Sequence, residues 1–182
     1  MEYKMHGDDV GALIALLKDS TDFNSMNSPM LRYSVDTLTV PAALQQKVQA
    51  VMQRPNWREE GRQRVLQEFL EILRFRHEQN GMTVDGQRIP TDPANRVAIA
   101  LLKVLPGKML PWKDSGSGQW IDFDEAKLHK VQDALAAYLQ RVSEAELKIF
   151  MQISQGRIKT KEDVEKQFNA AMIDHHQQNQ SS

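Results

Sequence analysis

The five histidines are the first candidates for metal chemistry, because a neutral imidazole is the commonest protein ligand for transition metals. No two of them form a His-Glu-x-x-His pattern, which would place both rings on one helix face beside a general base. The densest group, Asp174-His175-His176, lies in a polar C-terminal tail that we expect to be solvated. We therefore predict no metal and no other cofactor. The histidines are His6, His77, His129, His175 and His176.

Two groups of aspartates look like calcium ligands: Asp85 with Asp92, and Asp122 with Asp124. A calcium-binding loop needs oxygen ligands at alternate positions and a closing bidentate glutamate. Neither group has that spacing. We predict that these aspartates serve in turns and helix caps instead.

Gly116-Ser117-Gly118 is the stretch closest to a nucleophile or phosphate-binding motif. It is not a Gly-x-Ser-x-Gly elbow, and it lacks the later glycine, lysine and serine of the nucleotide-binding loops. The sequence contains no cysteine, which excludes disulfides, thiolate metal sites and cysteine nucleophiles. We predict that the protein is not an enzyme; a hydrolase site assembled from distant residues stays as a third alternative.

The overall composition is that of an ordinary globular protein. The 182 residues are 41% hydrophobic and 26% charged, with a formal net charge of -1. No global field therefore steers the chain to nucleic acid or to an anionic membrane. The N-terminus has no apolar signal segment, and the longest apolar runs are far too short to span a bilayer. We expect a soluble protein that is made inside the cell.

The longest helical pattern covers residues 57–79, where apolar residues recur at helical spacing on a broad face. The opposite face carries five arginines and, in the same stretch, five glutamates. Arginines along one helix are candidates for phosphate contacts, but interspersed glutamates favour a solvated face with internal ion pairs. The arginines are Arg58, Arg62, Arg64, Arg74 and Arg76.

The strongest local signals lie between residues 81 and 120. Asp85-Gly86 joins two short β-prone runs, which predicts a β-hairpin over about 81–90 with a type I′ turn. Gly81 follows Asn80 and is expected to end the preceding helix in the left-handed conformation. Asp92 is predicted to cap the next helix, with Pro93 in its first turn.

A second hairpin is predicted over about 109–122. Its connection, residues 113–118, is polar and glycine-rich, and Gly118 lies at the end of that turn. Trp112 and Trp120 flank the connection. We predict that both indoles pack against neighbouring helices as part of the core. The alternative is that they form a platform that binds a protein or a sugar. Together with Trp57, they are the candidate partner contacts.

Helices are predicted on both sides of this stretch. Asp8 or Asp9 is expected to cap a short N-terminal helix. Residues 20–29 are expected to form a loop, and residues 31–40 are expected to contain a strand. Pro41 is expected to begin a helix that ends before Pro55. Later, Asp122 or Asp124 is expected to cap one helix. Ser143 and Glu146 form a capping box that predicts a separate helix with Leu147, Phe150 and Ile153 on its apolar face. Gly156 ends that helix, and residues 160–163 begin the last one.

These elements predict an α+β fold that is mainly α-helical, with two short β-hairpins packed against helices. We divide the chain into an N-terminal helix and strand segment (1–56), a long connecting helix (57–80), an α+β domain (81–156), and a C-terminal helix with a frayed polar tail (157–182).

The block 74–153 resembles an uncharacterised domain family found in the tail regions of tailed phages and prophages. The resemblance rests on the run Gly81-Met82-Thr83-Val84-Asp85-Gly86-Gln87-Arg88-Ile89, on Asp92, on the apolar residues 97–102, on Trp112, Gly118 and Trp120, and on the helical residues 128–153. The turn at 113–118 is longer than the family pattern. Residues before 74 and after 153 lie outside the resemblance.

This resemblance implies a tail, baseplate or fibre component, or a tail-fibre assembly factor, that acts by protein–protein contact. Its partners would be tail-fibre or other tail proteins, a homo-oligomer is left open, and no membrane partner is expected. Its location would be the virion tail, or the host cytoplasm during assembly. The resemblance offers no catalytic residues. The alternative is a small regulatory or nucleic-acid-binding protein that uses the arginines of residues 57–80. Because positive and negative charges are balanced on that helix, we expect nucleic-acid binding less than protein–protein contact.

Overall fold

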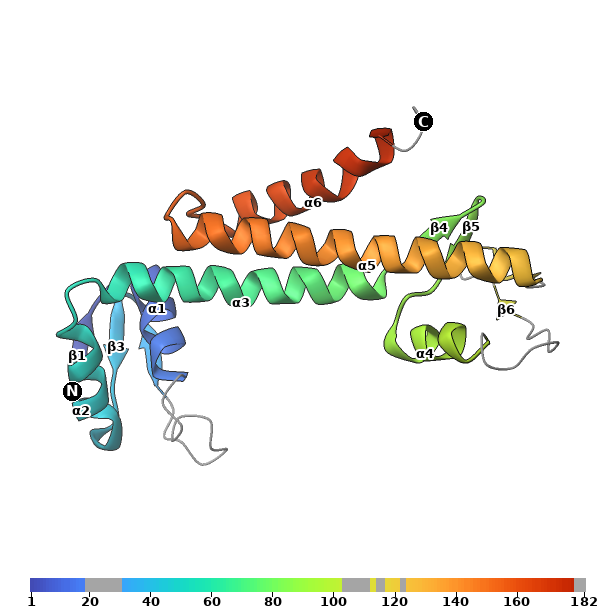
Figure 1. Cartoon of the computed structure of the whole chain (residues 1–182). Helices are drawn as coiled ribbons and strands as arrows, with labels where there is room; N and C mark the ends of the chain where they lie inside the picture. Colours follow the sequence, from blue (N-terminus) through green and yellow to red (C-terminus); the bar gives the residue numbers. More distant parts are fainter. Residues whose placement is uncertain (19–30, 103–111, 114–116, 122–123, 179–182) are drawn as a thin grey trace. The chain divides into compact units, whose positions relative to one another are not determined.

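The computed structural model describes residues 1–18, 31–102, 112–113, 117–121 and 124–178, and the structural statements below concern these residues. Within them the chain forms six helices and three small antiparallel sheets (Figure 1). The predicted fold class, α+β and mainly helical, is confirmed. The loop expected at residues 20–29 lies outside the described residues.

The chain divides into two compact units, and each is built from two separate segments. Unit 1 comprises Met1–Phe69 and Phe150–Val164, and unit 2 comprises Leu70–Ile149 and Glu165–Ser182. The divisions expected from the sequence follow the ends of secondary-structure elements. The compact units divide inside three helices instead, because a long helix can contribute to two cores along its length.

A three-stranded sheet in unit 1 consists of β1 (Glu2–Lys4), β2 (Arg32–Ser34) and β3 (Thr37–Thr39), in the order β1-β3-β2. Tyr3 and Tyr33 both pair with Leu38 on the central strand. The prediction of one strand over 31–40 is wrong, because the chain reverses at Val35 and Asp36. These two residues have φ angles of 43° and 61°, as a two-residue hairpin turn of type I′ requires.

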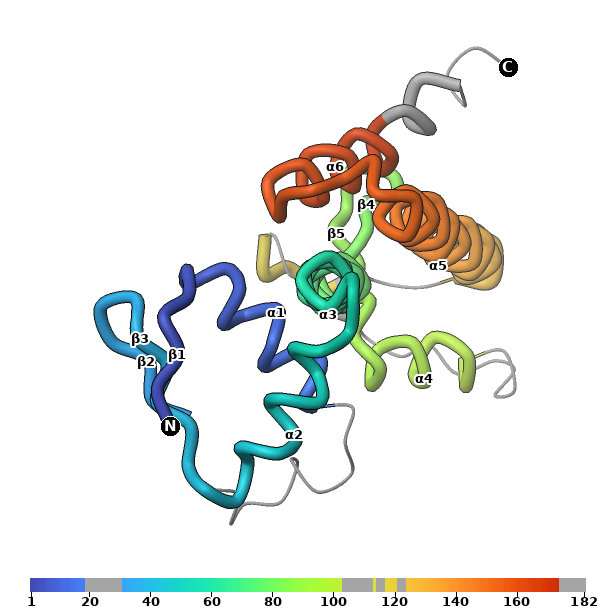
Figure 2. Tube along the Cα trace, turned by 90° about the vertical axis from the view of Figure 1, so that its left-hand side faces the viewer, coloured from blue at the N-terminus to red at the C-terminus, as the bar shows by residue number. Residues whose placement is uncertain are grey.

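Two helices cover one side of this sheet: α1 (Gly7–Lys18) and α2 (Ala42–Met52) (Figure 2). Their apolar residues form a core with residues of β3 and with Trp57, the first residue of the next helix. The cap predicted at Asp8 or Asp9 is wrong, because α1 begins at Gly7 and the backbone carbonyl of His6 accepts the amides of Asp9 and Val10. The core residues are Met5, Val10, Ala12, Leu13, Leu17, Leu38, Val40, Leu44, Val48, Val51 and Trp57.

The predicted helix over 57–79 is confirmed as α3 (Trp57–Gln79). In unit 1 it approaches α1 closely at Gly61. A β-carbon on Gly61 would lie 2.4 Å from the backbone oxygen of Ala12. Gly61, a residue with low helix propensity, therefore allows the close contact between two helices.

The connection between α5 (Glu125–Ser154) and α6 (Lys161–Gln178) belongs to unit 1. Gly156, with a φ of 68°, ends α5 as predicted, and its amide bonds to the carbonyl of Ile153 while that of Arg157 bonds to Gln152. This pair of bonds is a Schellman motif. Thr160 then caps α6 (Lys161–Gln178), because its hydroxyl accepts the amide of Asp163 at 3.1 Å.

Unit 2 contains the predicted Asp-Gly hairpin, formed by β4 (Met82–Val84) and β5 (Gln87–Ile89). Asp85 and Gly86 have φ angles of 50° and 75°, and Gly81 has a φ of 83°. These three predictions are confirmed. The hairpin is fastened by the fully buried Thr91, whose hydroxyl accepts the amide of Gly81 at 3.1 Å and donates to the carbonyl of Glu78 at 2.6 Å.

The predicted cap at Asp92 is also confirmed. Pro93 is the first residue of α4 (Pro93–Leu102). One carboxylate oxygen of Asp92 accepts the amides of Ala94 and Asn95, at 3.1 and 3.2 Å. The second oxygen accepts the side-chain amide of Asn95. This side-chain bond, followed by the backbone bonds, lowers the pKa of Asp92 below its usual value.

The second predicted hairpin is represented by β6 (Trp112–Lys113) and β7 (Trp120–Ile121), which pair antiparallel. Gly118 has a φ of 71°, which suits its predicted place in the turn. Residues 109–111, 114–116 and 122 of the predicted range lie outside the described residues, and these include Asp122.

The helix after this hairpin is α5 (Glu125–Ser154), one continuous helix of 30 residues, and Asp124 caps it by accepting the amide of Lys127 at 2.7 Å. The capping box predicted at Ser143 and Glu146 is therefore wrong. A stripe of buried residues at helical spacing runs through this point without interruption, so nothing in the packing ends the helix there. The stripe consists of Val131, Leu135, Tyr138, Val142, Ala145, Ile149 and Ile153.

Glu146 has a different role: it is an ion-pair partner of Arg74 on α3, with 3.1 Å between nitrogen and oxygen. Arg74 also pairs with Glu78, and Glu78 pairs with Arg96 of α4 at 3.2 Å. Burial raises the pKa of Glu146, and the nearby Arg74 opposes that shift. The network joins α3, α4 and α5 within unit 2.

The end of α3 is also held to α6 within unit 2. The imidazole of His77 lies 4.9 Å from the ring of the fully buried Phe168, and its Nε2 is 3.1 Å from the side-chain oxygen of Asn169. The Tyr138 hydroxyl of α5 donates to the backbone carbonyl of His77. His77 is thus a structural residue where three helices meet.

Candidate functional site

Of the three tryptophans predicted as partner contacts, Trp57 and Trp120 have opposite environments. Trp57 is only 4% exposed and belongs to the core of unit 1, so its prediction as a contact residue is wrong. Trp120 is 68% exposed, so the favoured prediction that it packs as core is wrong, and the contact alternative stays open. The side chain of Trp112 lies outside the described residues.

An exposed apolar strip lies on α5, on the side away from its buried stripe. It consists of Leu147, Phe150 and Met151, which are 61%, 44% and 52% exposed. Residues three and four apart on a helix are neighbours, so these three side chains adjoin one another by the geometry of α5 alone. The sequence reading placed Leu147 and Phe150 on a buried face, which is wrong. In the sequence, the strip can be recognised from the unbroken stripe of apolar residues at helical spacing. That stripe determines which face of α5 is turned inward, and therefore which face is exposed.

Two more helices expose pairs of large apolar residues in unit 2. Ile72 and Phe75 on α3 are 49% and 56% exposed, and Val97 and Leu101 on α4 are 58% and 52% exposed. Single exposed apolar side chains are common on protein surfaces. The strip on α5 differs because three large side chains occur within two helical turns.

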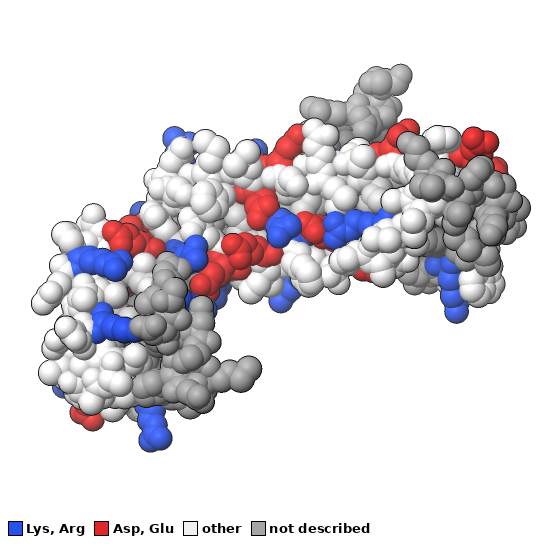
Figure 3. Space-filling view, turned by 60° about the horizontal axis from the view of Figure 1, so that its bottom comes forward, with Lys and Arg blue, Asp and Glu red and all other residues white. Residues whose placement is uncertain are grey.

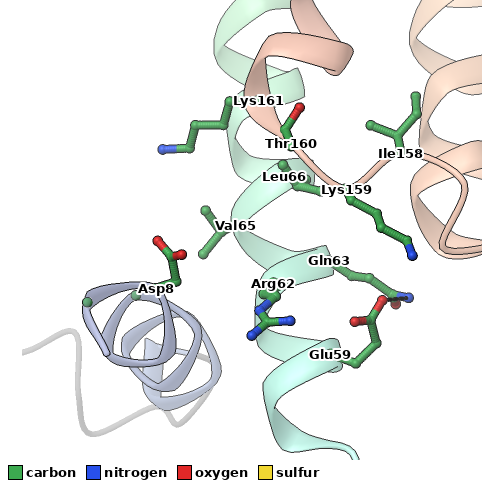
Figure 4. Close-up of a pocket in the computed structure, with 12 residues that line it drawn as sticks. Asp8, Glu59, Arg62, Gln63, Val65, Leu66, Ile158, Lys159, Thr160 and Lys161 are labelled. Carbon is green, nitrogen blue, oxygen red and sulfur yellow. Dashed lines mark hydrogen bonds between the residues drawn. The ribbon is translucent and has the colours of Figure 1, made fainter. Parts of the chain in front are cut away.

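Unit 1 contains a groove of about 710 Å³ (Figure 4). Its floor is the α3 segment that includes Val65 and Leu66. One wall is the first two turns of α1, where Gly7 and Gly11 present backbone, and the other is the connection that leads into α6. The lining residues are Gly7, Asp8, Gly11, Glu59, Arg62, Gln63, Val65, Leu66, Ile158, Lys159, Thr160 and Lys161.

The groove carries both signs of charge. Arg62 pairs with Asp9 at 3.3 Å, and Glu59 accepts the side-chain amide of Gln63 at 3.4 Å. The ammonium of Lys161 lies 5.5 Å from the centre of the Phe69 ring. Within the described part of the chain, Lys159 has no carboxylate partner. The groove is therefore not a site that selects one sign of charge, and it lacks the convergent, perturbed groups of a catalytic pocket.

The hairpin between β2 and β3 turns at Val35 and Asp36 and is joined to the start of α1 through Tyr33. The hydroxyl of Tyr33, on the strand before the turn, lies 3.3 Å from the carbonyl of Met5 and 3.2 Å from the carboxylate of Asp36, and these two acceptors share its single proton. The same hydroxyl would lie 3.7 Å from a β-carbon on Gly7, which lines the groove. Val35 itself is 90% exposed.

The arginines of α3 do not form a free cationic row. Arg58 and Arg62 pair with Asp9 at 3.0 and 3.3 Å, and Arg74 pairs with Glu78 and Glu146. Arg64 also has an interaction partner. On the face that Figure 3 presents, acidic and basic side chains alternate. Because phosphate contacts need arginines that are not already neutralised, these pairs weigh against the nucleic-acid alternative.

The described residues contain neither a cluster of metal ligands nor a membrane-spanning helix. No group of three or more His, Cys, Asp or Glu side chains in this part of the chain has the geometry to hold a metal ion. Among the described helices, none is both long enough and apolar enough to cross a membrane.

Comparison with known proteins gives no assignment: no protein-family model matches the chain, and neither does any curated protein or solved structure. The function must therefore be argued from the surface features above.

Proposed function

We propose that this chain acts by protein–protein contact rather than by catalysis, and that its setting is the tail of a tailed phage or prophage. It would be a tail, baseplate or fibre component, or an assembly factor for the tail fibre. The observation that supports a contact role is the exposed strip on α5. The phage setting draws on the resemblance of residues 74–153 to tail-region proteins.

The strip has the composition of an interface centre. Leu147, Phe150 and Met151 present two aliphatic side chains and a ring, and the unbranched methionine adapts to irregular partner surfaces. Interface centres are poor in charge and are rimmed by polar groups. Glu144 and Lys148, which are exposed on the same helix, supply such a rim. Docking of an apolar partner surface on this strip would remove three exposed apolar side chains from water.

The setting is tested by co-expressing the chain with the C-terminal fragment of the neighbouring fibre protein and with each other tail protein of the source phage. A stable complex with one of them is expected. Mass spectrometry of purified virions then separates a virion component from an assembly factor that leaves. Recovery of none of the tail proteins would show that the setting is wrong.

The contact surface is tested with Leu147→Asn/Met151→Asn against the captured partner. At least about tenfold weaker binding is expected, because apolar residues at an interface centre contribute most of the affinity. Val97→Asn is the matched control, since Val97 has similar exposure on another helix. Equal binding by the double variant and the wild type would refute the role of the strip, whatever the partner is.

A further inference from the structure

The junction between α3 and the β4–β5 hairpin contains the one Asn-Gly pair of the sequence, Asn80-Gly81. Asparagine is a thermolabile residue. When glycine follows it, the backbone nitrogen of the glycine can attack the carbonyl carbon of the asparagine side chain, because glycine has no β-carbon to hinder the approach. Asn80 is exposed directly after the end of α3, so water and base reach it. The junction therefore combines a reactive residue pair with an accessible position.

The fold requires the glycine of this pair. Gly81 has a φ of 83°, in the left-handed region that favours glycine. A β-carbon at this position would lie 2.8 Å from the backbone oxygen of Ile89 on β5. Both observations restrict position 81 to glycine, so any protection of Asn80 must come from the groups around the pair.

The peptide group between Asn80 and Gly81 is held at both of its polar ends. Its carbonyl oxygen accepts Nε and Nη2 of Arg88, at 3.2 and 2.5 Å. Its amide donates to the hydroxyl of Thr91 at 3.1 Å. Attack on the side chain requires this nitrogen to lose its proton and the peptide plane to turn toward the asparagine side chain. The two anchors oppose both changes.

The anchor at Thr91 is the buried one. Thr91 is fully buried, and its hydroxyl donates its only proton to the carbonyl of Glu78 at 2.6 Å. The hydroxyl oxygen therefore faces Gly81 as an acceptor. Breaking this bond would leave the amide of Gly81 without its buried acceptor, which costs free energy. The nitrogen that would start the reaction is thus the one that the fold holds most firmly.

We propose that Asn80 is a modification site at which succinimide formation is suppressed as long as Thr91 holds the amide of Gly81. When this anchor opens, the Gly81 nitrogen loses its proton to base and forms a bond to Cγ of Asn80. The side-chain nitrogen takes up a proton and leaves as ammonia. One water molecule then opens the five-membered ring, and residue 80 becomes aspartate or isoaspartate.

The product differs from the original junction in two ways. Isoaspartate lengthens the main chain by one methylene group between α3 and β4. Either product adds a negative charge at the C-terminal end of α3, where the helix dipole disfavours it. The change is covalent, so it leaves a permanent record that this junction has opened. The inference depends neither on the proposed phage setting nor on the α5 strip.

The reaction rate is measured on the purified full chain at mildly alkaline pH, with and without enough urea to unfold it. Tryptic digestion and mass spectrometry follow residue 80, because loss of ammonia and gain of water increase the mass of its peptide. The folded wild type is expected to react at least about tenfold more slowly than the unfolded chain, since a buried hydrogen bond must first break.

Two variants of the buried anchor separate the hydroxyl from the rest of the side chain. Thr91→Val removes the hydroxyl and should abolish most of the protection, whereas Thr91→Ser retains the hydroxyl and should react at the wild-type rate. Arg88→Gln releases the other end of the same peptide group from an exposed position, and it is also expected to accelerate the reaction. The test therefore does not depend on the folding of Thr91→Val.

Asp92→Ala is the matched control, because it weakens the neighbouring helix cap and leaves the hydroxyl of Thr91 in place. Its rate should stay close to that of the wild type. A wild-type chain that reacts as fast when folded as when unfolded would overturn the proposal. So would an Asp92→Ala variant that reacts as fast as Thr91→Val, since the rate would then follow stability rather than this bond. Wild-type rates in both Thr91→Val and Arg88→Gln would also overturn it.

Discussion

Replacement of Gly61 by alanine tests the close approach of α1 and α3. In an ordinary helix this change stabilises by up to about 1 kcal/mol, because alanine has the higher helix propensity. Here the new methyl group would lie 2.4 Å from the oxygen, 2.6 Å from the carbonyl carbon and 2.6 Å from the β-carbon of Ala12. All three distances are far inside van der Waals contact, and two of the three atoms are backbone, which no rotamer change can move.

Relief of this contact requires α1 to move away from α3 by roughly 1 Å, the difference between these distances and ordinary carbon–carbon contact. Ala12 and Leu13 are fully buried on α1, so the movement disturbs a packed core. Overpacking of this kind costs about 1–3 kcal/mol, and backbone contacts favour the upper part of that range. After the gain in propensity is subtracted, we expect a net loss of about 1–2 kcal/mol.

The assay is urea unfolding at low protein concentration, followed by circular dichroism, with Gly11→Ala as the matched control. Gly11 is also a helical glycine of unit 1, but its β-carbon position meets nothing within 4 Å. Gly11→Ala should therefore raise stability by about 0.5–1 kcal/mol. Opposite signs for the two substitutions are expected. A Gly61→Ala variant as stable as Gly11→Ala would refute the close approach and, with it, the arrangement of α1 and α3 in unit 1.

Substitutions at three further residues are tested by urea unfolding. Asp92→Ala should cost about 0.5–2 kcal/mol through the lost cap. The pKa of Asp92 is lower in the folded protein than its unfolded pKa of about 3.8. The charged carboxylate therefore stabilises the fold above the unfolded pKa, and this contribution is lost as the pH falls through the folded pKa. The variant Asp92→Asn, which can still cap the helix, should lack this loss of stability in acid. Ser143→Ala should be neutral or slightly stabilising, since Ser143 is exposed inside a continuous helix; a loss near 1 kcal/mol would restore the capping box. Trp57→Ala should cost about 3–5 kcal/mol, as expected for a buried aromatic residue, whereas a tryptophan that served only as a contact would lose binding and retain stability.

The features that could be predicted from the sequence are those that depend on a few adjacent residues. Asp85-Gly86 takes two positive φ angles, and Asp92-Pro93 starts a helix, wherever such pairs join suitable segments. The turn at Val35-Asp36 has the same backbone geometry but an unsuitable first residue, so no local rule indicates it. The strand after the turn, β3, pairs with β1 at the start of the chain, and the amide of Met5 donates to the carbonyl of Asp36 at 3.0 Å. A rule based on adjacent residues does not include these long-range bonds.

The wrong predictions at Ser143, Glu146, Trp57 and Trp120 share one physical cause: they concern which side of an element faces the core. Ser143 and Glu146 satisfy the pattern of a capping box, yet the buried stripe through Val142, Ala145 and Ile149 keeps α5 continuous. Trp57 and Trp120 are chemically identical, and only tertiary packing buries one and exposes the other. The α5 strip and the groove of unit 1 were missed for the same reason, because they arise from packing rather than from a motif.

Each unit consists of two segments that are far apart in the sequence, and this arrangement constrains how the protein folds during synthesis. Unit 1 joins Met1–Phe69 to Phe150–Val164, and unit 2 joins Leu70–Ile149 to Glu165–Ser182. A growing polypeptide therefore completes neither unit until most of the chain has left the ribosome, and the early segment of unit 1 must await its closing segment. A premature stop between the two segments of a unit removes that unit's second segment. A continuous fragment that contains all of unit 1 must also contain residues 70–149 of unit 2, so a minimal version of unit 1 would need its two segments joined by a new linker.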